Sequence, residues 1–183
     1  MTNNHVMIDI ETLSTRPNAV ILTIGAVKFD PFSLQEPGPG FYCRVEIDSQ
    51  DRHVCEDTMS WWAQQNPQVQ QEAFNEHDRL PLAQVLQDLS RFCDSQQGYW
   101  SHGVVFDMGI LEDAYVSLGL RAWIPWSYTL VRDCRTVLKI SNTPVERGDQ
   151  AHNALVDCWY QALAVQRACE KMGLHDKTGI ANH

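Results

Sequence analysis

Three short segments of this sequence contain acidic side chains that could do chemistry, and the spacing of the two in the first segment is suited to holding a metal ion. Asp9 and Glu11 lie two residues apart within the apolar run Met7-Ile8-Asp9-Ile10-Glu11. Alternate residues of a β-strand point to the same face, so the two carboxylates would project side by side. Neighbouring carboxylates repel each other unless a cation lies between them, and hard divalent ions such as Mg²⁺ and Mn²⁺ prefer oxygen ligands. The pair predicts half of a metal site; the alternative is an edge strand with a solvated acidic face.

Two later segments supply further carboxylates and a histidine. Asp107 ends the run SHGVVFD, and His152 precedes Asp157 by five residues in the run HNALVD. A histidine with an unperturbed pKa of about 6.5 is suited to accept a proton at neutral pH, which makes His152 a candidate general base. The alternative is a surface histidine beside a loop.

Taken in order, these motifs resemble the DEDD superfamily of 3′–5′ exonucleases, in the subclass with a histidine five residues before the last aspartate. Flanking segments make the chain similar to the bacterial and phage group that includes ribonuclease AS-type exoribonucleases and phage exodeoxyribonuclease A. These segments are Ile24-Gly25-Ala26-Val27, Thr58-Met59-Ser60-Trp61-Trp62 and Arg132-Asp133-Cys134-Arg135-Thr136.

The resemblance implies a reaction: metal-dependent hydrolysis of a phosphodiester strand from its 3′ end to nucleoside 5′-monophosphates. Two Mg²⁺ or Mn²⁺ ions roughly 3.5–4 Å apart activate water and stabilise the departing oxygen in such enzymes. By resemblance, Asp9 bridges both ions, Glu11 and Asp157 bind the ion on the nucleophile side, and Asp107 acts mainly through water on the other. His152 is then the general base.

The resemblance also implies residues that bind the substrate. Thr12 and Leu13 are expected to hold the 3′-terminal nucleotide, and Phe106 to approach its sugar. For Leu13, wedging between bases and ordinary core packing are both open, and Phe106 has the same core alternative.

The adjacent tryptophans Trp61 and Trp62 divide between two environments. Neighbouring residues on a helix lie about 100° apart, so both rings cannot face one core. We expect Trp61 to pack inside and Trp62 to lie near the substrate, where stacking on a base is worth about 1–3 kcal/mol.

The resemblance further implies a homodimer. In the similar group, the segment around Arg132 helps to build a dimer, so that Arg132 is expected to contact substrate across the interface. We expect a structural role for Arg135, with phosphate binding as the alternative.

Length and composition bound the other properties of the chain. With 183 residues, it is predicted to form a single exonuclease domain over residues 1–173 and a disordered tail over 174–183. No signal peptide or apolar stretch of about 20 residues is visible, and the six cysteines are scattered, which predicts a cytoplasmic protein without membrane contact. The formal charge of −9 argues against a tight architectural DNA binder.

The sequence pattern predicts an α/β fold: a mixed five-stranded sheet, with an antiparallel meander and parallel strands, flanked by helices. This agrees with the ribonuclease H-like fold that the resemblance implies. Strands are predicted at 6–10, 20–29, 41–47, 99–102 and 128–131, and helices at 56–65, 67–74, 81–92, 107–118, 133–140 and 153–172.

The predicted substrate is the 3′ end of single-stranded DNA or RNA, because such a site recognises a terminus rather than a duplex. Two alternatives remain: a catalytically silent nucleic-acid-binding module on the same fold, and an oligonucleotide-specific phosphodiesterase. The intact acidic cluster argues against the silent module, since a protein without a metal gains nothing from repulsive carboxylates.

Overall fold

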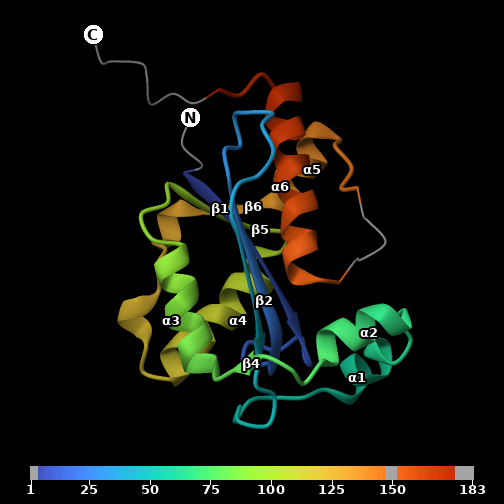
Figure 1. The fold of residues 1–183 in the computed structure, drawn as a ribbon. Helices are drawn as coiled ribbons and strands as arrows, with labels where there is room; N and C mark the ends of the chain where they lie inside the picture. The colour runs from blue at the N-terminus through green and yellow to red at the C-terminus, as the bar shows by residue number, and fades with distance from the viewer. Residues whose placement is uncertain (1–3, 147–151, 176–183) are drawn as a thin grey trace.

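A mixed six-stranded sheet forms the centre of the protein in a computed structural model that describes residues 4–146 and 152–175. The spatial order is β4-β3-β2-β1-β5-β6 (Figure 1). The strands are β1 (His5–Thr12), β2 (Ile21–Phe29), β3 (Gly40–Val45), β4 (Arg79–Leu80), β5 (Gly98–Ser101) and β6 (Val131–Asp133). The predicted meander is confirmed, since β1, β2 and β3 pair antiparallel, whereas β5 and β6 join in parallel beyond β1.

Helices cover both faces of the sheet. Figure 1 shows α3 and α4 on one side and α5 and α6 on the other, with α1 and α2 side by side near the start of α6. Two short 3₁₀ helices, η1 (Arg121–Trp123) and η2 (Tyr128–Leu130), follow α4. The helices are α1 (Glu56–Trp62), α2 (Pro67–Phe74), α3 (Leu82–Phe92), α4 (Val104–Ser117), α5 (Cys134–Ser141) and α6 (Ala154–Lys171).

Strand β1 separates two hydrophobic cores. Its residues Val6, Ile8 and Ile10 pack with α3 and α4, whereas Met7 packs on the other face with α5 and α6. Because strand side chains alternate, Asp9 and Glu11 continue the Met7 face, toward α6. The apolar core thus ends on that face where the two acidic residues begin.

Gly25 sets how closely α6 approaches the sheet. It pairs with Asp9 across β1 and β2. A Cβ atom at Gly25 would lie 2.3 Å from the carbonyl carbon of Ala154, the first residue of α6. Only glycine lets the first turn of α6 rest directly on β2, which brings this turn next to Asp9.

Three predictions about individual elements are wrong. The sheet has six strands rather than five, because Arg79 and Leu80 pair with β3 as the short strand β4. The strand predicted at 128–131 is mostly the 3₁₀ helix η2, whose start the Ser127 side chain caps, and pairing begins only at Val131. The helix predicted from Asp107 begins three residues earlier, at Val104.

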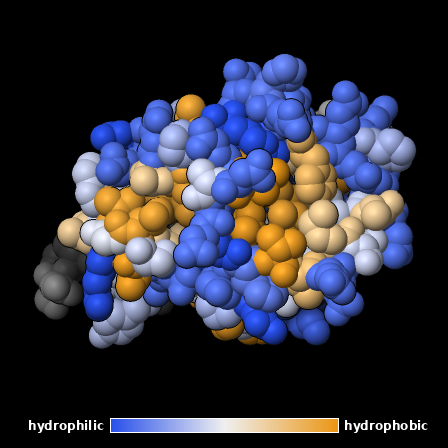
Figure 2. All heavy atoms as spheres, turned by 90° about the horizontal axis from the view of Figure 1, so that it is seen from below, coloured by the Kyte–Doolittle hydropathy of each residue, from blue (hydrophilic) through white to orange (hydrophobic). Residues whose placement is uncertain are grey.

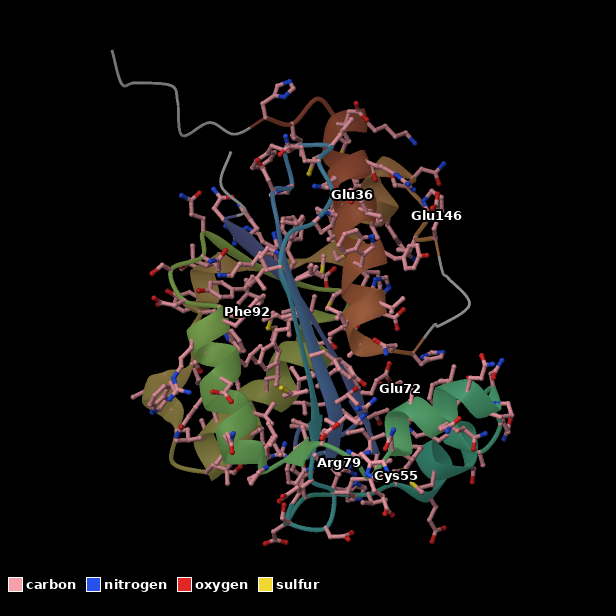
Figure 3. The ribbon with its side chains drawn as sticks, viewed as in Figure 1. Glu36, Cys55, Glu72, Arg79, Phe92 and Glu146 are labelled. Atoms are coloured by element: carbon pink, nitrogen blue, oxygen red, sulfur yellow. The ribbon has the colours of Figure 1, made fainter. Side chains whose placement is uncertain are left out.

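Arg79 explains why so short a strand is held in place. Its guanidinium donates to the carbonyls of Leu22, Val45 and Ala73, which ties β2, β3 and α2 together. Figure 3 shows Arg79 at the lower end of the sheet, with Glu72 of α2 nearby.

Residues 147–151, just before His152, and residues 176–183 of the predicted tail lie outside the described residues. Within the described residues, no helix is long and apolar enough to cross a membrane.

Candidate active site

The four predicted carboxylates and His152 line one pocket, which we call the acidic pocket. They come from three elements: the end of β1, the first turn of α4, and α6 with the residue just before its cap. Residues far apart in sequence therefore meet where β1 passes the starts of two helices. The acidic pocket is lined by Asp9, Ile10, Glu11, His102, Gly103, Phe106, Asp107, Arg135, Val145, His152, Asp157 and Gln161.

The two helix-borne aspartates occupy equivalent positions. Asp107 and Asp157 are each the fourth residue of their helix. Each carboxylate accepts a hydrogen bond from the backbone N–H of a residue just before the start of that helix. The Gly103 amide donates to Asp107 Oδ2 at 3.2 Å, and the His152 amide donates to Asp157 Oδ2 at 2.9 Å. The helix macrodipole favours negative charge at this end. Both helix starts therefore hold a carboxylate directed toward the pocket.

Burial and mutual repulsion make the acidic pocket unfavourable for negative charge. The pKa of Asp9 is raised well above its usual value by burial and then by Asp107 and Asp157, against a hydrogen bond from Gln161. Burial also raises the pKa of Glu11, with repulsion from Asp9 adding most to it. The pKa of Asp107 is raised by burial to about 7. Such a cluster favours a bound cation over protons at neutral pH.

His152 is fixed on three sides. Its backbone lies in the left-handed region (φ 69°), its amide is bonded to Asp157, and its ring meets the Trp61 ring edge-on at 4.9 Å between centroids. Its Nδ1 lies 3.9 Å from Glu11 Oε1, and 29% of its side chain is exposed. A left-handed backbone is costly for a non-glycine residue and is concentrated at functional sites. The imidazole therefore lies at the solvent edge of the pocket.

The predicted orientation of the tryptophan pair is wrong. Trp62 is only 1% exposed and packs with Leu13 and Phe74. Its Nε1 donates to the Thr12 carbonyl at 2.9 Å, so the ring is committed to the core and leaves no face for a base. Trp61 is 41% exposed, lies next to His152, and lines a neighbouring hollow with Glu11, Thr12 and Phe106. The two tryptophans were assigned to the wrong environments because the sequence does not show which side of this helix faces the core.

The structure gives different environments to the other predicted substrate residues. Leu13 is buried in the core beneath Trp62, which contradicts the wedge between bases and favours the core alternative. Thr12 lines the Trp61 hollow, although its hydroxyl donates to the Ser14 carbonyl. Phe106 lines both this hollow and the acidic pocket. Substrate contact by Thr12 and Phe106 stays a prediction.

Two arginines of one segment differ in position. Arg132 does not line any of the four described hollows at or beside the acidic pocket, and its Nη1 donates to the carbonyls of Thr129 and Val131. Its contact with substrate across a dimer stays a prediction. Arg135, which was expected to be structural, is exposed and lines the acidic pocket.

Gln161 is a site residue that the sequence reasoning missed. It is buried on α6, and its Nε2 donates to Asp9 Oδ1 at 3.0 Å. Its position four residues after Asp157 puts it on the same helix face, a spacing that would have identified it. The bond links the strand carboxylate to the helix that carries Asp157.

The donor set fits a hard divalent cation. One ligand atom each from Glu11, His152 and Asp157 lies within 4.8 Å of the others. Buried carboxylates that repel one another form an oxygen-rich, anionic environment of the kind that Mg²⁺ or Mn²⁺ complements. Asp9 and Asp107 line the same pocket and extend the set.

Solved structures with a similar fold are nucleases. The nuclease domain of 3′hExo, a DEDDh family member, bound to rAMP, has a TM-score of 0.58 at 15% identity, covering 91% of each chain. Exonuclease X in complex with 5′ overhanging duplex DNA has a TM-score of 0.53 at 18% identity, covering 92% of this chain and 93% of that chain. Pop2p of S. pombe, in a Mg²⁺- and Mn²⁺-bound form, has a TM-score of 0.58 at 11% identity, covering 91% and 83%. These likenesses establish the ribonuclease H-like fold.

No curated protein sequence matches the chain. A family model described as "3′-5′ exoribonuclease Rv2179c-like domain" matches residues 4–169, which include every carboxylate of the acidic pocket and His152. The family match and the acidic pocket together identify a divalent-metal-dependent enzyme that acts on nucleic acid. The chain belongs to the Rv2179c-like 3′–5′ exoribonuclease domain family, and it is a 3′–5′ exonuclease.

Proposed function

We propose that the enzyme removes nucleoside 5′-monophosphates from the 3′ end of single-stranded nucleic acid, using two divalent ions in the acidic pocket. The observation that carries this proposal is the convergence of four carboxylates from β1, α4 and α6 with His152 at one pocket. When bound, divalent ions supply the charge that activates water and stabilises the departing 3′ oxygen. Asp9, Glu11, Asp107 and Asp157 would hold them.

His152 would accept the proton of the attacking water. The ring lies at the open edge of the pocket, where water has access, and contact with Trp61 restricts its rotation. Glu11, 3.9 Å away, would stabilise the protonated imidazole that forms. Positioned proton transfer of this kind contributes about 10²–10⁴ to rate.

The exposed Trp61 would stack on the terminal base. Its hollow opens beside Glu11 and Thr12, and so a base stacked there would leave its 3′ linkage near the carboxylates. The family description favours RNA as the substrate over DNA. Stacking on a ring without specific hydrogen bonds predicts little base preference.

We also propose a homodimer in the cytoplasm. Figure 2 shows two apolar patches separated by a band of hydrophilic residues on one face, and apolar surface patches mark interaction sites. All six cysteines are free, which is typical of a reducing compartment.

The direct test incubates the protein with RNA and DNA of one sequence, labelled at the 5′ end, with Mg²⁺, Mn²⁺ or chelator. Asp157→Ala is the inactive variant, and Asp94→Ala, an exposed aspartate outside the pocket, is its matched control. We expect a ladder that shortens from the 3′ end, faster on RNA, and absent with chelator or with Asp157→Ala.

The other outcomes identify the alternatives. Cleavage of dinucleotides but not of 20-mers would make the protein an oligonucleotide phosphodiesterase. Binding of either polymer without any product would make it a silent nucleic-acid-binding module.

A further inference from the structure

Arg135 lies where three hollows meet. It lines the acidic pocket, a hollow beside the start of α4, and a third hollow along α5 that also contains Lys139. It does not line the hollow of Trp61. Arg135 thus borders a part of the acidic pocket that does not belong to the hollow of the exposed tryptophan.

Cations are scarce around this site. The chain has 14 lysines and arginines against 23 acidic residues. Among the residues that line the acidic pocket and the three described hollows next to it, the only ones are Arg135 and Lys139, one helical turn apart on α5. Within residues 4–146 and 152–175, these two residues therefore provide the positive charge that lines these hollows.

No interaction within the described residues holds the Arg135 side chain in place. Arg44, Arg52 and Arg91 each form an ion pair, whereas the Arg135 side chain forms neither an ion pair nor a hydrogen bond with any residue of 4–146 or 152–175. Its neighbour Asp133 attracts it without forming an ion pair, and that carboxylate accepts hydrogen bonds from Thr136 and from the Val104 amide. Its guanidinium is left available for a ligand.

Arg135 lies beside the starts of two helices, α5 and α4. It is the second residue of α5, and its Nη2 lies 3.3 Å from where a Cβ of Gly103, the residue that caps α4, would lie. The macrodipole makes a cation unfavourable at both helix starts. An anion that binds between them would be attracted by the guanidinium and by both helix ends.

We infer that Arg135 binds a backbone phosphate on the 5′ side of the cleaved linkage. The inference rests on the proposed function: with the terminal base at Trp61 and the cleaved phosphate over the carboxylates, the strand leaves the acidic pocket past Arg135 and then Lys139. The arginine would make substrates of three or more nucleotides bind more tightly than dinucleotides.

The test measures binding, so that it does not depend on turnover. Fluorescence anisotropy with 5′-fluorescein RNA of two, three, five and ten nucleotides, in Ca²⁺ to slow hydrolysis, compares Arg135→Gln, Arg135→Lys and the wild type. Arg121→Gln, which removes an exposed arginine that lines none of these hollows, is the matched control. We expect Arg135→Gln to weaken binding of the five-nucleotide RNA about tenfold and of the dinucleotide less than twofold.

Salt dependence distinguishes a phosphate contact from a change in structure. Loss of one phosphate contact makes the slope of log affinity against log salt shallower by about 0.7 for single strands. Arg135→Lys should restore the slope, and Arg121→Gln should not change it. Unchanged affinity and slope in Arg135→Gln would overturn the inference, as would equal weakening of the dinucleotide and the ten-nucleotide RNA. Failure of the proposed function would instead appear as no ladder with the wild type.

Discussion

The floor and the rim of the acidic pocket are built differently. The floor consists of carboxylates that are largely buried, and β1 and the first turn of α4 fix them: Asp9, Glu11 and Asp107. The rim consists of partly exposed side chains at or just before the starts of α5 and α6 and at the end of α1: Arg135, His152 and Trp61. The floor thus concentrates charge at a cost in stability, whereas the rim offers groups that can reach solvent and substrate.

The floor should dominate catalysis. Asp9→Asn removes one charge while its side-chain oxygen can still accept the hydrogen bond from Gln161. We expect kcat to fall at least about 10³-fold, because the lost charge weakens metal binding. The melting temperature without metal should not fall, because repulsion in the pocket is relieved.

Asp94→Asn is the control, since it removes the same charge from an exposed position. Activity of Asp9→Asn within tenfold of the wild type would contradict a catalytic floor.

The rim histidine should have the next largest effect. His152→Asn keeps a residue type that tolerates the left-handed backbone but cannot act as the base. We expect kcat to fall about 10²–10⁴-fold with the affinity for Mn²⁺ within a few-fold of the wild type. Loss of Mn²⁺ binding would instead make His152 a ligand, as its distance to Glu11 and Asp157 permits.

Substitutions of the two adjacent tryptophans compare a residue of the rim with a residue of the core. Trp61→Ala should raise KM about 5–150-fold with little change in stability, because a stacking surface for the terminal base is lost. Trp62→Phe should leave KM unchanged and lower the free energy of unfolding by about 0.5–1.5 kcal/mol, through loss of the bond to the Thr12 carbonyl. Steady-state kinetics measure KM, and urea unfolding measures the free energy of unfolding. A raised KM in Trp62→Phe with an unchanged KM in Trp61→Ala would instead make Trp62 the residue that binds the substrate.

The smallest effect is the dependence of stability on pH. The pKa values of Asp9, Glu11 and Asp107 are raised on folding, so the folded state holds more protons than the unfolded state. Stability without metal should therefore decrease as pH rises from about 4 to about 7, by several degrees in melting temperature.

Asp9→Asn should flatten that decrease, and Mn²⁺ should remove it. A curve in chelator that is identical for the wild type and Asp9→Asn would contradict the raised pKa values.

The floor was predictable from the sequence and most of the rim was not. Alternation along β1 puts Asp9 and Glu11 on one face whatever surrounds the strand, and apolar periodicity predicted α3 and its buried residues. Rim contacts depend on how helices dock on one another. A helix with two adjacent tryptophans does not reveal which one faces the core until α2 and Leu13 pack against it.

Two other differences arise from contacts between residues that are distant in sequence. Strand β4 has only two residues, too few for any periodicity, and it depends on the bonds of Arg79 to distant carbonyls. The role of Arg135 depends on the meeting of α4 and α5, which no local pattern encodes.

The count of Mn²⁺ ions bound by the acidic pocket is the most direct measurement. Electron paramagnetic resonance of free Mn²⁺ during titration gives this count for the wild type, Asp9→Asn and Asp94→Asn. We predict two ions per chain for the wild type and for Asp94→Asn, with at least one lost in Asp9→Asn. No bound Mn²⁺ in the wild type, or equal binding in all three proteins, would contradict a metal centre built on these carboxylates.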